Sequence, residues 1–208
     1  KTPLTSIINY VDLIKKENVS EPTVREYVDV LDRQSARLKK LIEDLLEASK
    51  ASTGNVEMHM EACDATVMIS QIVGEYQEKL QKKNIDIVVN ESEVPAIMAD
   101  GRHLWRVFDN IMTNICKYTQ EHTRVYVDVT DAGDEVNMTF KNISKYPLNI
   151  TSDELMERFV RGDASRNTEG HGLGLSIAQS LTELMGGQLS IAIDGDLFKI
   201  TVAMKKQA

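Results

Sequence analysis

The sequence predicts an α+β protein: an N-terminal antiparallel helical hairpin followed by an α/β sandwich with a mixed sheet and helices on one face. Three observations lead to this prediction. Apolar residues recur every three or four positions through the N-terminal quarter of the chain. A cluster of turn-forming residues, Ser52-Thr53-Gly54-Asn55, then interrupts the pattern, and helical and strand-like segments alternate after it. We therefore expect two domains, 1–54 and 55–208.

The hairpin is predicted from two amphipathic repeats. The first places Leu4, Ile7, Ile8, Val11 and Ile14 on one helical face, with Pro3 suited to the first turn. A second, longer repeat covers 24–45. Two such helices bury little surface alone, so we predict a homodimer in which two hairpins form a four-helix bundle. Packing of the hairpin on the rest of its own chain stays open as the alternative.

The second domain is predicted from changes of period. Helical periodicity covers 67–83 and 103–118, and strand-like runs of β-branched and apolar residues occupy 85–89, 124–130, 136–140, 189–193 and 198–204. Residues 131–134 and 194–196 have the composition of hairpin turns. This order predicts a mixed sheet covered by helices, without the regular alternation of a Rossmann fold.

Composition limits the function classes. The formal net charge of -8 argues against sequence-independent nucleic-acid binding. Cys63 and Cys116, the two cysteines, lie outside any CxxC spacing and predict neither a disulfide framework nor a zinc site. No apolar run approaches the roughly 20 residues that cross a bilayer, so we expect a soluble chain without membrane contact. The absence of an initiator methionine suggests a fragment of a longer protein.

The glycine-rich segment Gly170-His171-Gly172-Leu173-Gly174-Leu175 precedes a helical pattern that ends at Gly186-Gly187. Glycines let the backbone approach phosphates closely, and the first turn of the next helix offers unpaired amide donors. The segment therefore predicts a phosphate-binding lid. No Gly-Lys-Ser/Thr follows, so it is not a P-loop. A flexible surface turn would show the same glycines.

A second candidate site lies on the helix predicted at 103–118. Asn110, Asn114 and Lys117 fall along one side of it, with Tyr118 beside them. An amide oxygen can bind Mg²⁺, an ammonium can offset phosphate charge, and a phenol ring can cover a base. Asparagine is a poor helix former, so two asparagines on one face favour a use beyond solvation. An ordinary exposed polar face is the alternative.

Four ordered segments together resemble the sensor histidine kinase family across essentially the whole chain. Lys1-Thr2-Pro3-Leu4 resembles the end of the H box, Arg106 to Thr119 the N box, Glu157-Arg158-Phe159-Val160-Arg161 the F box, and Gly170 to Leu175 the second glycine box. The resemblance implies a Bergerat-type ATP-binding fold. It also implies phosphoryl transfer from Mg·ATP to a histidine and then to an aspartate of a response regulator.

The resemblance assigns roles to the matched positions. Asn114 would bind Mg²⁺, with Asn110 beside it near the γ-phosphate, while Lys117 would contact phosphate and Tyr118 would stack near adenine. Arg161 would reach the γ-phosphate during transfer, and the lid residues Gly170, Gly172, Leu173, Gly174 and Leu175 would close over the nucleotide. Thr2 occupies the position of the threonine used in the reverse, phosphatase reaction. The regulator would dock near residues 1–14 of a cytoplasmic domain, whose parent protein would be anchored in the membrane.

Two departures from the family pattern matter. The phosphoacceptor histidine would lie three residues before Lys1, and none of His59, His103, His122 and His171 is in the expected helix. This chain alone would therefore bind ATP without autophosphorylating. In place of the first glycine box, Asn142 stands where the family has an adenine-binding aspartate, and Ser144 and Tyr146 replace glycines. An asparagine can still offer a carbonyl oxygen, but the charge is lost.

Two alternatives follow. A degenerate module could bind nucleotide or act as a scaffold and signal without phosphotransfer, which the changed first glycine box would favour. Another ATPase of the same superfamily, such as an anti-sigma-factor kinase, would lack the Thr-Pro-bearing hairpin.

Overall fold

The structure is a computed structural model that describes residues 3–15, 21–52, 56–148 and 173–207. Contacts between residues divide the chain into two compact units, Lys1–Glu47 and Ala48–Ala208. The division falls inside a helix that continues to Ser52, a few residues before the turn cluster that suggested a boundary. The boundary between residues 54 and 55 stays a prediction.

The first unit is a helical hairpin, as predicted. Helix α1 spans Pro3–Ile14 and helix α2 spans Glu21–Ser52. The rings of Tyr10 and Tyr27 pack between them with centroids 5.3 Å apart. Large apolar side chains nevertheless remain exposed on both helices, namely Leu4, Ile8, Val28, Ile42, Leu45 and Leu46. No helix within the described ranges is both long and apolar enough to cross a membrane.

The second unit contains a five-stranded mixed sheet in the order β2-β4-β5-β7-β6. Its strands are β2 (Asp86–Glu91), β4 (Arg124–Ala132), β5 (Glu135–Ile143), β6 (Gln188–Asp194) and β7 (Leu197–Lys205). Strand β2 pairs parallel with β4, and the remaining neighbours are antiparallel. The predicted hairpin turns at 131–134 and 194–196 are present in the structure. They form because Gly133 and Gly195 have φ values of 75° and 57°, which glycine adopts readily.

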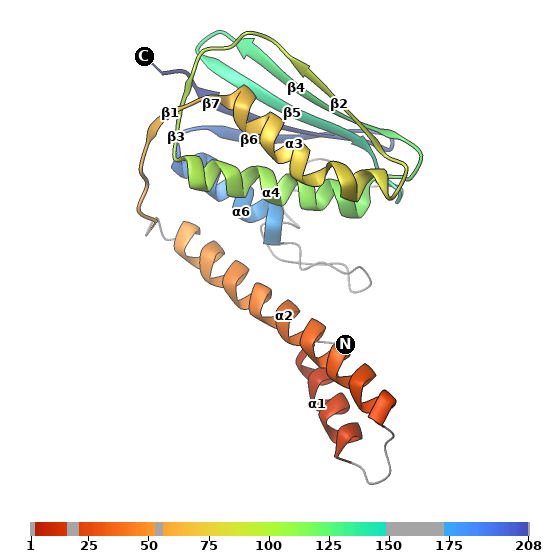
Figure 1. Ribbon diagram of the computed structural model, residues 1–208. Coiled ribbons are helices and arrows are strands. Elements are labelled where there is room, and N and C mark those ends of the chain that lie inside the picture. Colours follow the sequence, from red (N-terminus) through yellow and green to blue (C-terminus); the bar gives the residue numbers. More distant parts are fainter. Residues whose placement is uncertain (1–2, 16–20, 53–55, 149–172, 208) are drawn as a thin grey trace. The chain divides into compact units, whose positions relative to one another are not determined.

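Three helices lie against one face of this sheet: α3 (Ala65–Gln81), α4 (Gly101–Tyr118) and α6 (Leu173–Leu184) (Figure 1). Alternate residues of the strands face these helices and form the core, for example Val125, Val127 and Val129 of β4. The other face is polar: the carboxylate of Asp128 accepts a hydrogen bond from Asn90 Nδ2 at 2.7 Å and pairs with Lys141 Nζ at 2.5 Å. A polar residue on the helix-covered face is therefore an exception.

A small antiparallel sheet, absent from the prediction, joins β1 (Glu61–Cys63) to β3 (Ile97–Ala99). Each strand has three residues, too few for an alternating pattern to stand out in the sequence. The sheet matters for the site because β3 leads directly through Asp100 into α4.

Candidate functional site on helix α4

Helix α4 presents the predicted site residues because its opposite side is apolar. Leu104, Val107, Phe108, Ile111, Met112 and Ile115 are buried against the core. This burial fixes the rotation of the helix and leaves Asn110, Asn114 and Lys117 together on the half-buried side. Lys117 Nζ lies 5.1 Å from the ring centroid of Tyr118. The structure thus brings the four predicted N-box residues to one surface.

The first turn of α6 lies against this surface. A Cβ atom added at Gly174 would lie 3.4 Å from Asn110 Oδ1, so the last glycine of the predicted lid contacts the first asparagine of the helix. Within the described part of the chain, Asn110 Nδ2 is buried without a hydrogen-bond partner. The first amides of a helix likewise lack intrahelical acceptors. Donors from two segments therefore converge on a place suited to phosphate oxygens.

Other buried polar residues gather at the C-terminal end of α4. Asn142, near the end of β5, is 3% exposed, and Thr119, the C-cap of α4, is 1% exposed. Thr119 forms an isolated antiparallel bridge with Ser144, two residues after Asn142. The Oγ1 atom of Thr119 is buried and has no hydrogen-bond partner among the described residues. Thr119 was not among the predicted site residues, although it directly follows Tyr118 in the sequence.

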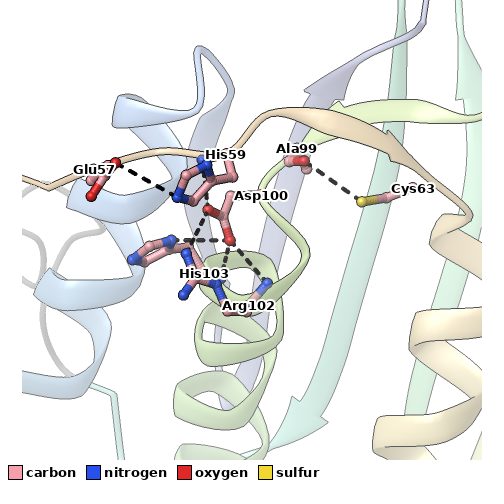
Figure 2. A network of polar contacts seen from close by, with 7 residues as sticks. All are labelled: Glu57, His59, Cys63, Ala99, Asp100, Arg102 and His103. Atoms are coloured by element: carbon pink, nitrogen blue, oxygen red, sulfur yellow. Dashed lines mark hydrogen bonds and ion pairs between the residues drawn. The ribbon is translucent and has the colours of Figure 1, made fainter.

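Asp100 holds the N-terminal end of α4 (Figure 2). Its carboxylate is 1% exposed and accepts hydrogen bonds from the backbone amides of Arg102 at 3.0 Å, His103 at 3.2 Å and His59 at 2.8 Å. His103 Nδ1 lies 3.1 Å from Asp100 Oδ1. Burial alone would raise the pKa of Asp100, but the backbone amides of His59 and His103 and the imidazole of His103 outweigh it and hold the pKa well below its ordinary value.

The sequence motifs do not include this cap, although an aspartate immediately before a helical pattern is a sequence signal for an N-cap. The contact with His59 could not be predicted, because it joins residues 41 positions apart. Asp100 therefore fixes both the start of α4 and the segment that precedes β1.

The side chain of Tyr76, on α3, forms hydrogen bonds with α4. Its hydroxyl donates to Asp109 Oδ1 at 2.5 Å and lies 2.9 Å from Thr113 Oγ1. Arg106 Nη1 pairs with the other carboxylate oxygen of Asp109 at 3.3 Å. Burial and the bond to Asp109 raise the pKa of Tyr76. The phenol therefore stays protonated and keeps Asp109, the neighbour of Asn110, in place.

Of the remaining predicted site residues, some lie outside the described structure and others lie in α6. Thr2, Arg161, Gly170 and Gly172 lie outside the described residues. Leu173 begins α6. Leu175 is 4% exposed with its side chain in the core, so any contribution to nucleotide binding falls to its backbone.

The site fits a magnesium nucleotide in the chemistry of its donors. Mg²⁺ prefers oxygen ligands and usually keeps several waters, so one or two amide oxygens plus phosphates make a reasonable set. Asn114 and Asn110 supply amide oxygens, and Lys117 supplies a cation for phosphate.

Two family models match the sequence. The model of the His Kinase A (phospho-acceptor) domain matches residues 1–54. The model of the histidine kinase-, DNA gyrase B- and HSP90-like ATPases matches residues 99–206, which include α4, the lid segment and the last strands. The chain belongs to the sensor histidine kinase family. Its two units correspond to the phosphoacceptor and ATPase parts of that family's catalytic core.

Curated relatives agree with this assignment to the histidine kinases. The sensor protein VanSC of Enterococcus gallinarum is 28% identical over 211 residues, covering 100% of this chain and 58% of VanSC. The histidine protein kinase SaeS of Staphylococcus aureus is 27% identical over 214 residues, covering 99% of this chain and 60% of SaeS. The chain thus spans less than two thirds of the length of these relatives.

Solved histidine kinases share the fold. The Acinetobacter baumannii histidine kinase AdeS superposes with a TM-score of 0.76 at 14% identity, covering 100% of this chain and 96% of that one. The histidine kinase ThkA, in its complex with the response regulator TrrA, gives a TM-score of 0.77 at 21% identity over 99% of this chain and 58% of that one.

Proposed function

We propose that the chain is a histidine kinase core that binds Mg·ATP along α4 and delivers the γ-phosphoryl group to a histidine, which then passes it to a response-regulator aspartate. The observation that carries this proposal is the meeting of Asn110 with Gly174. It joins the predicted N box to the predicted lid and leaves a buried amide donor, Asn110 Nδ2, without a partner in the described structure.

In this proposal each residue has a positioning or electrostatic role. Asn114 gives its amide oxygen to the cation, Lys117 offsets phosphate charge, and Tyr118 covers the base. Arg161, outside the described residues, neutralises charge on the transferred group. Magnesium, held by Asn114 when bound with the nucleotide, would neutralise negative charge on the phosphates during transfer. Such reactions depend chiefly on positioning and charge neutralisation, which are the roles proposed for these residues.

The response regulator is proposed as the protein partner, docking on the hairpin near residues 1–14. The structural relative ThkA was solved in complex with the response regulator TrrA, which supports a similar partner here. We further propose that the chain lies in the cytoplasm as part of a membrane-anchored sensor. Thr2 would act in the reverse, phosphatase reaction.

The test uses a longer chain extended upstream through the histidine that the family pattern places three residues before Lys1. Incubation with Mg·ATP labelled at the γ-phosphate should give an acid-labile, base-stable phosphoprotein. Replacing that histidine by glutamine is the matched control and should abolish the label while preserving ATP binding.

A second candidate, a degenerate module that binds nucleotide without transferring phosphate, is favoured by the changed pocket around Asn142. ATP binding without any labelling of the longer chain would contradict the kinase proposal and support this candidate instead.

A further inference from the structure

The base end of the proposed nucleotide site contains a neutral polar cluster on an otherwise apolar face. Its members are Thr119, Asn142 and Ser144, which are 1%, 3% and 9% exposed. Asn142 and Ser144 are two residues apart and share one face of the extended chain, while Thr119 is bridged to Ser144. The side chains preceding them on that face, Met138 and Phe140, belong to the hydrophobic core.

The hydrogen bonds within this cluster leave one hydroxyl unused. Ser144 Oγ donates to the carbonyl oxygen of Tyr146 at 2.8 Å and accepts from the amide of Tyr146 at 3.2 Å. Thr119 Oγ1 has no partner among the described residues, although it is buried. Burying such a hydroxyl without a partner costs about 1–3 kcal/mol, so a bound group that pairs with it gains a corresponding advantage.

The chemistry of the cluster differs from that of a carboxylate pocket. A carboxylate only accepts hydrogen bonds, so one that faces the 6-position of a purine pairs with the 6-amino group of adenine and repels the 6-oxo group of guanine or hypoxanthine. The carboxamide of Asn142 can present either its carbonyl oxygen or its NH₂ group, and the hydroxyl of Thr119 can donate or accept. The pair can therefore match the 6-amino group of adenine or, after an amide flip, the 6-oxo group of guanine or hypoxanthine.

We propose that Thr119 and Asn142 form a two-way base-recognition pair, so that the site binds 6-oxopurine nucleoside triphosphates as well as ATP. This inference rests on the proposed nucleotide-binding function and specifies its substrate class as purine nucleoside triphosphates. Selectivity in such a site comes from phosphate and shape contacts, which the two kinds of purine share.

Titration of the chain with Mg·ATP, Mg·GTP and Mg·ITP tests the inference. We expect dissociation constants within about tenfold of one another, a difference of no more than about 1.4 kcal/mol. Asn142→Asp should change the GTP-to-ATP ratio of dissociation constants by at least about tenfold in favour of ATP, because a buried carboxylate repels the 6-oxo group.

Thr119→Val keeps the shape but removes the hydroxyl, and should weaken ATP and GTP alike by at least about 5-fold. Thr119→Ser keeps a hydroxyl at this position and should bind ATP and GTP as tightly as the wild type. The control is Thr139→Val, because Thr139 is also a buried threonine but pairs with Thr201 Oγ1 at 3.1 Å on the far side of β5. It should leave both affinities unchanged.

The outcomes separate the two proposals. ATP binding with GTP and ITP weaker by about a hundredfold or more overturns the base-recognition inference and leaves the kinase proposal intact. An unchanged GTP-to-ATP ratio in folded Asn142→Asp, or unchanged affinities in Thr119→Val, overturns it as well. Failure to bind any nucleotide contradicts the proposed function itself and the inference with it.

Discussion

Single buried polar residues determine where the site forms. Asn110 and Thr119 leave unpartnered polar atoms at the two ends of the same helix surface in the described structure, and Asp100 gathers three backbone amides at the start of that helix. The predicted N box includes Asn110, but the sequence alone does not show which polar residues near it are buried. Thr119 is almost completely buried, whereas Thr113, on the same helix, is exposed and engaged with Tyr76.

Asp100→Asn should reduce the dependence of stability on pH. A carboxyl whose pKa is lowered by folding contributes stability that is fully present above its ordinary pKa of 3.8 and is lost as the pH falls below it. Urea unfolding at pH 7 and pH 3 should show wild type losing more stability than the variant over this interval. At pH 7 the variant should be less stable by about 1–2 kcal/mol.

The matched control is Asp64→Asn. Asp64 also caps a helix, α3, but is exposed and accepts from one amide, that of Val67. Because Asp64 accepts fewer hydrogen bonds, its substitution should cost less stability at pH 7 than Asp100→Asn. Equal pH dependence of wild type and Asp100→Asn would refute the account of the buried cap.

At the scale of elements, close approach between α6 and the sheet depends on a glycine. A Cβ atom at Gly187, just after α6, would lie 2.5 Å from both the carbonyl oxygen of Ala203 and Met204 Sδ. The neighbouring Gly186 has a φ of 76°, which ends the helix. The predicted helix end at this glycine pair is therefore explained by both a turn and a contact.

Gly187→Ala should destabilise the domain by at least about 1–3 kcal/mol, because a backbone atom cannot move aside cheaply. Gly74→Ala is the control: Gly74 is inside α3, its added Cβ meets nothing within 4 Å, and alanine is favoured there by about 1 kcal/mol. Thermal or urea unfolding should therefore move in opposite directions for the two variants. Similar shifts for both would contradict the packing of β7 against this turn.

The elements were predictable where periodicity was strong. Five strands and the helices at α3 and α4 agree with the predicted ranges to within a few residues, because their apolar residues alternate or recur on one face over six or more positions. Strands β1 and β3 were not predicted, because a strand of three residues is too short to show an alternating pattern. The predicted residues do share one side of α4, but the contacts of α4 with Tyr76 and Gly174, and of its N-cap Asp100 with His59, join distant segments, which local patterns do not encode.

At the scale of the molecule, the helical unit exposes more apolar surface than a stable monomer would be expected to leave. Ile42, Leu45 and Leu46 of α2 are 52%, 59% and 57% exposed, and Leu4 and Ile8 of α1 are 53% and 52% exposed. A family model of the phosphoacceptor domain matches the same residues. These observations support the predicted homodimer, in which the exposed stripes of two hairpins face each other.

Ile42→Glu should convert the dimer to a monomer, because it places a charge in the proposed apolar interface. Lys39→Glu introduces the same side chain at a position that is 79% exposed and should leave the dimer intact. Sedimentation equilibrium at micromolar concentration distinguishes the two. A wild-type monomer, or a dimeric Ile42→Glu variant, would show that the exposed stripe is not the interface.

We propose that α4 holds a magnesium nucleotide through Asn114. Calorimetric titration with ATP, with and without Mg²⁺, tests it most directly. We predict Mg-dependent binding that falls by more than about a hundredfold in Asn114→Ala. It should persist in Asn137→Ala, a matched change on β5, whose Asn137 pairs with Thr130 and Ala203 and lies away from α4. Binding that is unchanged in Asn114→Ala, or that does not depend on Mg²⁺, would contradict the account.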